Sequence, residues 1–298
     1  MKKNELILGS HVMMKAPNYF LGSVQEALSY QANALMIYTG PPQNTIRKNI
    51  NEMKITDAQK LWRENGCDLS SIIIHAPYII NLASVDEQKR AFGVDFFIKE
   101  VERTKALGAK YIVLHPGSAV NTTSQAAIEF LSQSLTTVIA KTQDVIICLE
   151  TMAGKGNEIG RDFKQLHDII EKTKNNQRLG ICLDTCHIHD AGYDLSDVDK
   201  LVAQIDKEVG FERIKVVHFN DSLNFISAHK DRHANIGYGH IGFENLLNLL
   251  YHEKFLGLPV ILETPYVDDK PPYAVEIEML KKQKFTNPFA ASDKKIKA

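Results

Sequence analysis

Short apolar segments typical of β-strands recur along the chain, and amphipathic stretches separate them. The apolar segments cover residues 6–11, 34–39, 71–78, 111–118, 145–151, 179–187, 214–221 and 259–265. Their hydrophobic residues are continuous rather than alternating, which is typical of parallel strands buried on both faces. The segments start 28 residues apart at the closest (6 to 34) and 45 at the furthest (214 to 259). This spacing fits one strand–helix unit for each segment.

The amphipathic stretches have apolar residues at helical spacing. They include residues 95–110, in which Gly108 is a helix stop signal, as well as 123–142 and 243–255. Eight strand–helix units in series predict an α/β protein of the (β/α)8 TIM barrel class. No linker or low-complexity segment divides the sequence. We therefore expect residues 1–298 to form one domain, with a flexible C-terminal tail at 291–298.

Each predicted strand ends in polar residues that can carry chemistry. These are His11, Tyr38, His75, His115, Glu150, Asp184 with His187, His218 and Glu263. A barrel places the C-terminal ends of all its strands on one face, where barrel enzymes carry out their reactions. The loop after the seventh predicted strand adds Asp231 and His233 on the same side. We therefore expect residues that are far apart in the sequence to meet in one pocket.

Nine of these residues are candidate metal ligands, five of them histidines and four carboxylates. They are His75, His115, Glu150, Asp184, His187, His218, Asp231, His233 and Glu263. A zinc ion takes about four ligands, so nine predict two or three ions. Imidazole and carboxylate without thiolate favour zinc, manganese or iron over magnesium. We expect Asp184 and His187 on one short turn, and Asp231 and His233 on an extended loop.

Composition and charge add few constraints. The chain has 298 residues, of which 44% are hydrophobic and 24% charged, and its formal net charge is −1. This ordinary globular balance neither indicates nor excludes a local nucleic-acid-binding face. No apolar run approaches the roughly 18 residues of a membrane span, and the run near the N-terminus is too short for a signal peptide. The four cysteines fit a reduced, intracellular protein, and we interpret Cys182 and Cys186 as packing residues.

Three glycines after the seventh predicted strand match a nucleotide-binding pattern only in part. Gly237, Gly239 and Gly242 have the spacing G-x-G-x-x-G. In a dinucleotide-binding site this motif directly follows a strand. Because no strand leads into it here, we exclude that function.

The motifs resemble those of the endonuclease IV family of zinc-dependent abasic-site (AP) endonucleases. The segments that carry the resemblance follow the family's order over almost the whole chain: HAPYIINLAS (75–84), LHPGS (114–118), LETMAGKGNEIG (149–160), LDTCHIHDAGYD (183–194), HFNDS (218–222), DRHANIGYGHIG (231–242) and LETP (262–265). The resemblance implies a single (β/α)8 barrel with three zinc ions (Zn2+). It gives the first ion His75, His115 and the bridging Glu150. It completes the second with Asp184, His218 and Glu263, and the third consists of His187, Asp231 and His233.

The resemblance also implies the reaction and the partner. The family hydrolyses duplex DNA on the 5′ side of an abasic site, leaving a 3′ hydroxyl and a 5′ deoxyribose phosphate, and it trims blocked 3′ ends. Closely spaced metals suit this reaction because they lower the pKa of bound water and neutralise the leaving oxyanion. Glu150 is the expected catalytic residue, since it would hold the hydroxide in position. We expect a cytoplasmic monomer that associates with the nucleoid through DNA and has no membrane partner.

Tyr78 is the candidate residue for contact with damaged DNA. It follows His75 by three residues and matches a side chain that the family inserts at the lesion; a tyrosine that packs at the rim is the alternative. The loop after the second predicted strand reads YTGPPQNTIRKN and differs from that of the family's best-studied members. Gln43, Asn44 and Arg47 are candidate contacts in this loop.

A metal-dependent sugar isomerase or epimerase is the main alternative, because related barrels also gather histidines and carboxylates at the strand ends. Such an enzyme needs one or two metals and a base. The additional group of His187, Asp231 and His233 favours the phosphodiesterase. A non-catalytic zinc-storage or DNA-scaffold protein is a third alternative. Metal content separates them: about three zinc ions per chain support the nuclease, and one or two support the isomerase.

Overall fold

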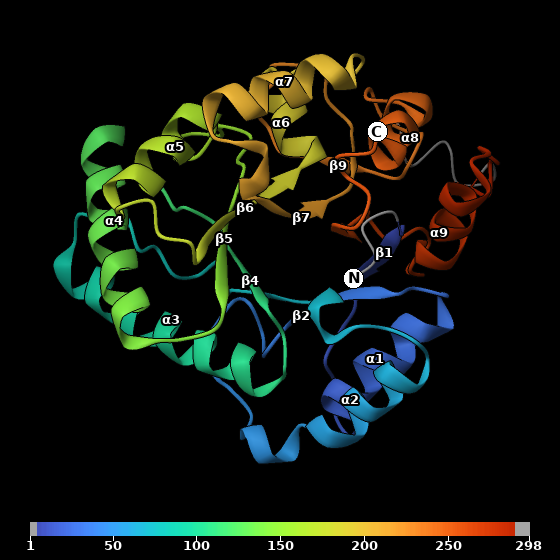
Figure 1. Cartoon of the computed structure of the whole chain (residues 1–298), viewed down its shortest axis with the longest axis horizontal. Coiled ribbons are helices and arrows are strands. Elements are labelled where there is room, and N and C mark those ends of the chain that lie inside the picture. Colours follow the sequence, from blue (N-terminus) through green and yellow to red (C-terminus); the bar gives the residue numbers. More distant parts are fainter. Residues whose placement is uncertain (1–4, 290–298) are drawn as a thin grey trace.

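A computed structural model describes residues 5–289 and has eight parallel strands closed into a barrel (Figure 1). The strands are β1 (Ile7–His11), β2 (Ala34–Tyr38), β3 (Ile72–His75), β4 (Tyr111–Leu114), β5 (Ile146–Glu150), β6 (Leu179–Asp184), β7 (Ile214–His218) and β10 (Pro259–Leu262). Each strand pairs with its neighbours in sequence, and β10 pairs with β1 to close the ring. The predicted barrel is therefore confirmed. The tail predicted to be flexible, 291–298, lies outside the described residues.

Nine α-helices in the described residues pack around the strands (Figure 1). They are α1 (Tyr19–Ser29), α2 (Ile55–Glu64), α3 (Glu87–Ala106), α4 (Ser124–Lys141), α5 (Phe163–Lys172), α6 (Thr185–Ala191), α7 (Val198–Glu208), α8 (Phe243–Tyr251) and α9 (Tyr273–Lys282). Side-chain caps fix several of their starts: Asp86, Thr123 and Asp162 each accept a hydrogen bond from the backbone N–H three residues later. No helix in residues 5–289 is long and apolar enough to cross a membrane.

The barrel has two apolar layers. Side chains along each strand alternate between these layers, and this alternation determines which residues reach the site. One layer fills the inside of the barrel with ten residues that include Ile73 and Cys148. The other lies between strands and helices and includes Ile72 and Ile74. Because side chains alternate along a strand, a residue two positions beyond an inward residue also points inward. His75 follows Ile73 by two positions, as Glu150 follows Cys148, so both lie above the packed interior.

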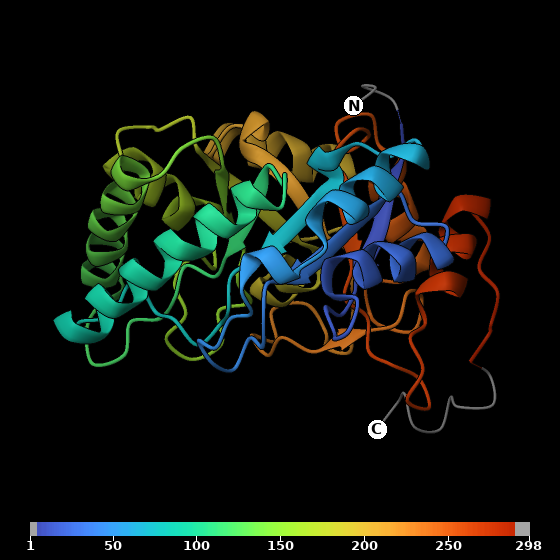
Figure 2. The same ribbon diagram turned by 90° about the horizontal axis from the view of Figure 1, so that it is seen from below.

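A short antiparallel ribbon follows β7 and was not predicted. Its strands are β8 (Asp221–Ser222) and β9 (His233–Ala234). The chain between them leaves the barrel mouth and returns to it, which brings Asp231 and His233 back beside the strand ends. The side view in Figure 2 shows the loops that follow the barrel strands gathered on the lower edge of the molecule.

Candidate metal centre

The polar residues predicted at the strand ends lie there in the structure. His11, Tyr38, His75, Glu150, Asp184 and His218 are the last residues of their strands, and His115 and Glu263 come directly after β4 and β10. The barrel therefore brings residues from its whole circumference to one mouth.

The nine candidate ligands form three groups whose nitrogen and oxygen atoms lie within 4.8 Å of one another. The groups are His75, His115 and Glu150; Glu150, Asp184, His218 and Glu263; and His187, Asp231 and His233. Each group has the donors that suit a metal ion with imidazole and carboxylate ligands. These groups contain the residues that the family resemblance assigns to each ion, and their occupation by three metals stays a prediction.

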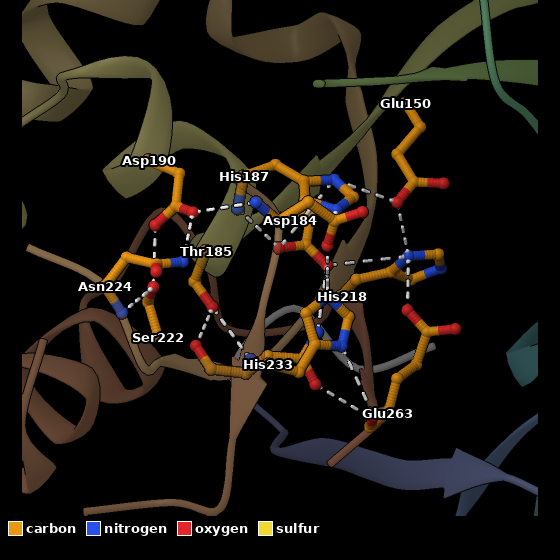
Figure 3. A network of polar contacts seen from close by, with 12 residues as sticks. Glu150, Asp184, Thr185, His187, Asp190, His218, Ser222, Asn224, His233 and Glu263 are labelled. Carbon is orange, nitrogen blue, oxygen red and sulfur yellow. Dashed lines mark hydrogen bonds and ion pairs between the residues drawn. The ribbon is translucent and has the colours of Figure 1, made fainter. Parts of the chain in front are cut away.

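Glu150 lies at the centre of the cluster and contacts four imidazoles. Its Oε2 lies 3.2 Å from Nε2 of both His75 and His115. Its Oε1 lies 3.1 Å from Nδ1 of His218 and 3.3 Å from Nδ1 of His187 (Figure 3). The side chain is almost completely buried. One carboxylate can therefore serve two adjacent groups, one through each oxygen.

Asn220 supports the group that contains Asp184, His218 and Glu263. His218 Nδ1 lies 2.9 Å from Oε2 of Glu263. The buried amide of Asn220 donates to Oδ2 of Asp184 at 2.9 Å, and its oxygen accepts from the backbone N–H of Glu263 at the same distance. This residue was not predicted from the sequence. Its position, two residues after His218 on a chain of alternating side chains, is the signal that could have identified it.

The residues of the third group come from α6, which contains His187, and from β9 and the chain that leads into it, which contain His233 and Asp231. Asp184 caps α6 by accepting a hydrogen bond from the backbone N–H of His187 at 2.8 Å, so the two residues lie on a helix start rather than on the expected turn. His187 Nε2 lies 3.1 Å from Oδ1 of Asp231. His233 Nε2 lies 3.6 Å from the same oxygen and 3.7 Å from Oδ2 of Asp184.

Backbone carbonyls orient three of the imidazoles. Nδ1 of His75 donates to the carbonyl of Ala76 at 2.7 Å, and Nδ1 of His187 donates to the carbonyl of Thr151 at 2.8 Å. Nδ1 of His233 donates to the backbone carbonyl of Glu263 at 3.3 Å. A carbonyl only accepts, so in the neutral form of each ring Nε2 carries the lone pair, as in metal-binding histidines. His233 Nε2 is buried and has no hydrogen-bond partner among the described residues. These features fit a bound metal.

The electrostatics of the cluster also favour bound cations. Burial raises the pKa of the Glu150 carboxyl, but His218 and His115 outweigh this effect and hold the pKa well below its usual range. Burial lowers the pKa of His187, but Asp184, Asp231 and Glu150 raise it well above its usual value. The buried carboxylates thus stay ionised only with positive charge beside them. Metal ions supply that charge when the histidines are neutral ligands.

The glycine-rich segment wraps around the buried carboxylate of Asp221. This side chain accepts hydrogen bonds from the backbone N–H groups of Gly237 at 3.1 Å, Gly239 at 3.0 Å, Ile241 at 2.9 Å and Gly242 at 3.3 Å. A Cβ atom on Gly239 would lie 2.4 Å from Oδ1 of Asp221. The glycines of the G-x-G-x-x-G motif therefore bind a carboxylate of the protein itself. This role differs from the binding of a dinucleotide, which was excluded from the sequence.

The two predicted regions of DNA contact differ in exposure. Tyr78 is 51% exposed, in the loop after β3. Gln43 is also exposed. Arg47 is not a DNA contact candidate in this structure, because its side chain is only 9% exposed and its Nε lies 2.9 Å from the buried carboxylate of Glu100. Glu100 lies on α3, so the sequence of the loop alone could not identify it as the partner of Arg47.

The three principal ligand groups contain no cysteine, although Cys182 contacts His218. Cys182 packs inside the barrel beside Cys148, as predicted for Cys182. Cys186 is buried in α6 and could form a further group with Asp184 and His233. Burial raises the pKa of its thiol, which disfavours the thiolate form that binds metal.

The chain is similar to some known proteins in both sequence and fold, and to others in fold alone. A family model described as a xylose isomerase-like TIM barrel matches residues 24–283. A relative from Acholeplasma laidlawii named probable endonuclease 4 is 53% identical over 285 residues, 95% of this chain and 97% of the relative. The crystal structure of endonuclease IV from Thermus thermophilus has a TM-score of 0.79 and 27% identity, and the match covers 92% of this chain and 97% of that one. A D-tagatose 3-epimerase-like protein has a TM-score of 0.68 and 22% identity over 92% and 96% of the two chains, a likeness of fold alone.

Proposed function

Since the chain belongs to the endonuclease IV family of metal-dependent AP endonucleases, we propose that it hydrolyses duplex DNA on the 5′ side of abasic sites. The products are a 3′ hydroxyl and a 5′ deoxyribose phosphate, and blocked 3′ ends are trimmed at the same site. A single observation carries the proposal: Glu150 belongs to two ligand groups at once and contacts four imidazoles.

The proposed cofactor is zinc, three ions per chain. His75, His115 and Glu150 would hold the first, and Glu150, Asp184, His218 and Glu263 the second. His187, Asp231 and His233 would hold the third. Zinc ions bound there supply Lewis acidity and positive charge for the hydrolysis of a phosphodiester.

The residues of the chain prepare the site for this chemistry. Glu150 is the proposed catalytic residue because each of its oxygens faces a different ligand group, which fixes the place where the attacking oxygen and the phosphate meet. The carbonyl bonds of His75, His187 and His233 hold the rings in one tautomer. The buried side of the cluster excludes water, whereas partly exposed members such as His115 and Glu263 face the open mouth.

Exposed side chains beside the cluster are candidate contacts for DNA. A pocket of about 590 Å³ adjoins His233, and its lining includes Arg232 and Tyr266 as well as the acidic residues Asp268 and Asp269. Arg232 is exposed, so it can contact a phosphate. Tyr78 is the proposed lesion contact: its half-exposed ring, three residues beyond His75, can fill the gap left by a missing base.

The test is incubation of purified protein with an end-labelled duplex that contains one abasic site. We expect one nick on the 5′ side of the site, loss of cleavage after chelation and recovery on addition of zinc, with an intact duplex as the control. Metal analysis of the same sample should give about three zinc ions per chain. Failure of the zinc-loaded protein to cut would overturn the proposal. One or two metals together with sugar epimerisation would support the isomerase instead.

A further inference from the structure

We propose that Asp190 is a positioning residue that holds Asp231 in place, so that the third metal group is complete only while Asp190 is intact. The inference rests on the proposed function for the identity of the metal and for the role of Asp231 as a ligand. Asp190 lies in α6, three residues after His187. Its side chain is fully buried and has no part in the chemistry described above.

Three hydrogen bonds from the loop after β7 end on the carboxylate of Asp190. Oδ1 accepts from the hydroxyl of Ser222 at 2.6 Å. Oδ2 accepts from the amide of Asn224 at 2.8 Å and from the backbone N–H of Asp231 at 2.9 Å. Figure 3 shows Asp190 beside Ser222 and Asn224. The backbone carbonyl of Asp190 also accepts from the N–H of His229 at 3.0 Å. One residue therefore ties down both ends of the loop.

The backbone of this loop needs such support. Its φ angle is +58° at Asp231, +54° at His229 and +66° at Ser227. These are left-handed conformations that residues other than glycine rarely adopt, and they persist where surrounding contacts hold them. The N–H of Asp231 is bonded to Asp190 at one of these strained positions. The bond therefore sets the direction in which the side chain of Asp231 leaves the loop, toward Nε2 of His187 at 3.1 Å.

The two anchors of the third group lie on the same helix. His187 and Asp190 are three residues apart on α6 and therefore share one side of it. Because the helix is a rigid spacer, the bond from Asp190 to Asp231 fixes the separation of His187 and Asp231. A change at Asp190 should loosen this pair and leave the two groups that share Glu150 in place.

The carboxylate is the chemical feature that this network needs. All three groups that contact this side chain act as donors, and a carboxylate accepts from them all. Asp190→Asn does not test the network, because the hydroxyl of Ser222 can turn to accept the new N–H group while the bond from Asp231 persists. Asp190→Ala removes all three bonds.

The experiment measures zinc content and zinc release from the holoenzyme by mass spectrometry during titration with a chelator. The variants are Asp190→Ala and Asn224→Asp, the second of which places a like charge against Asp190 at a half-buried position. The control is Asp194→Ala, because Asp194 also accepts a backbone N–H but is exposed. We expect both variants to hold one of the three zinc ions with about 10- to 100-fold lower affinity, whereas the control releases zinc like the wild type.

Each outcome separates a role in positioning from a role in folding. Loss of one zinc, with two retained and an unchanged thermal melt, supports the proposal. Three zinc ions held with wild-type affinity by the folded variants overturn it. If Asp190→Ala does not fold, Asn224→Asp decides the question in the same way. A wild-type protein with fewer than three zinc ions would contradict the proposed function rather than this inference.

Discussion

The Nε atom of Arg47 lies 2.9 Å from Oε1 of Glu100, and this ion pair joins the loop after β2 to the interior of α3. Glu100 is fully buried and also accepts a hydrogen bond from the hydroxyl of Thr39 at 2.6 Å. The guanidinium of Arg47 donates to the carbonyls of Asn44 and Ile46 at 3.0 and 2.9 Å. A charged residue in a loop near the barrel mouth is thus an internal anchor that fixes the conformation of the loop.

Arg47→Met should therefore destabilise the protein strongly. The change leaves the buried carboxylate of Glu100 without its main partner, and breaking a buried pair in this way costs about 3–5 kcal/mol. Arg103, at 3.9 Å from the same oxygen, can compensate in part, so we expect about 3 kcal/mol in the free energy of unfolding from urea titration. Lys48→Met is the matched control, because Lys48 pairs with Glu52 on the surface. Equal stability of the two variants would contradict the role of Arg47 as an anchor.

The barrel and the position of the candidate ligands at its mouth could be predicted from the sequence because both depend on local patterns. A buried parallel strand is a continuous apolar run, and the polar residue that ends it marks the mouth of the barrel. His75 and Glu150 could be assigned to the site in this way, without knowledge of any contact. Alternation along the strand then directs both side chains to the inside.

The support around the ligands could not be predicted, because it depends on contacts between distant segments. Asp190 bonds to Asp231 across 41 residues, and Arg47 bonds to Glu100 across 53. No local pattern distinguishes an exposed arginine in a loop from a buried one. The glycines around Asp221 were visible as a motif, but their partner lies 16 to 21 residues earlier in the chain.

Gly239→Ala should destabilise the glycine-rich segment that follows β9 and wraps around Asp221. A Cβ atom there would lie 2.3 Å from the carbonyl oxygen of Ser222 and 2.4 Å from Oδ1 of Asp221, so the backbone must shift and weaken the bonds to Asp221. We expect a loss of about 1–3 kcal/mol, the usual cost of overpacking, measured by thermal or urea unfolding. Gly93→Ala in α3 is the control, since its nearest contact would be 3.5 Å. That variant should be as stable as the wild type or slightly more so; a larger loss there than at Gly239 would refute the explanation.

Glu276→Gln should remove part of the dependence of stability on pH. Burial raises the pKa of Glu276 to about 7, although Ile236 and Asn235 donate hydrogen bonds to its Oε1. The neutral acid is therefore the form that the fold favours. Its contribution to stability is fully present below the unfolded pKa near 4.5 and is lost as the pH rises through 7, a change on the order of 3 kcal/mol.

The measurement is the free energy of unfolding of wild type and Glu276→Gln between about pH 4.5 and 8. Glutamine retains an acceptor for Ile236 and a donor toward Thr264, so the variant should gain on the wild type as the pH rises. Glu278→Gln on the same helix is the control, because Glu278 pairs with Lys282 at the surface. A constant difference between wild type and Glu276→Gln over this range would show that Glu276 is ionised in the fold.

Glu150→Gln should nearly abolish cleavage of abasic duplex and leave the fold intact. Glutamine turns an N–H group toward two of the four imidazoles that contact Glu150, and one of the two ligand groups loses its shared oxygen. The barrel is held by its apolar layers, so a cooperative thermal melt should persist. Activity within about tenfold of wild type, a barrier change near 1.4 kcal/mol, would disprove the catalytic role. Loss of the melt would show that the cluster also holds the fold together.

Tyr78→Ala should weaken binding to abasic duplex without a change in zinc content. The ring is 51% exposed and lies outside the three ligand groups, so its removal leaves the metal site intact. If the ring stacks in the gap left by a missing base, the variant should lose about 1–3 kcal/mol of binding free energy on abasic duplex and much less on intact duplex. The quantity to compare is the ratio of the two affinities at one salt concentration, because contacts with phosphates contribute to both. Tyr78→Phe retains the stacking surface and should retain the wild-type ratio. An equal loss on both duplexes would mean that Tyr78 contacts only the DNA backbone or packs at the rim of the barrel.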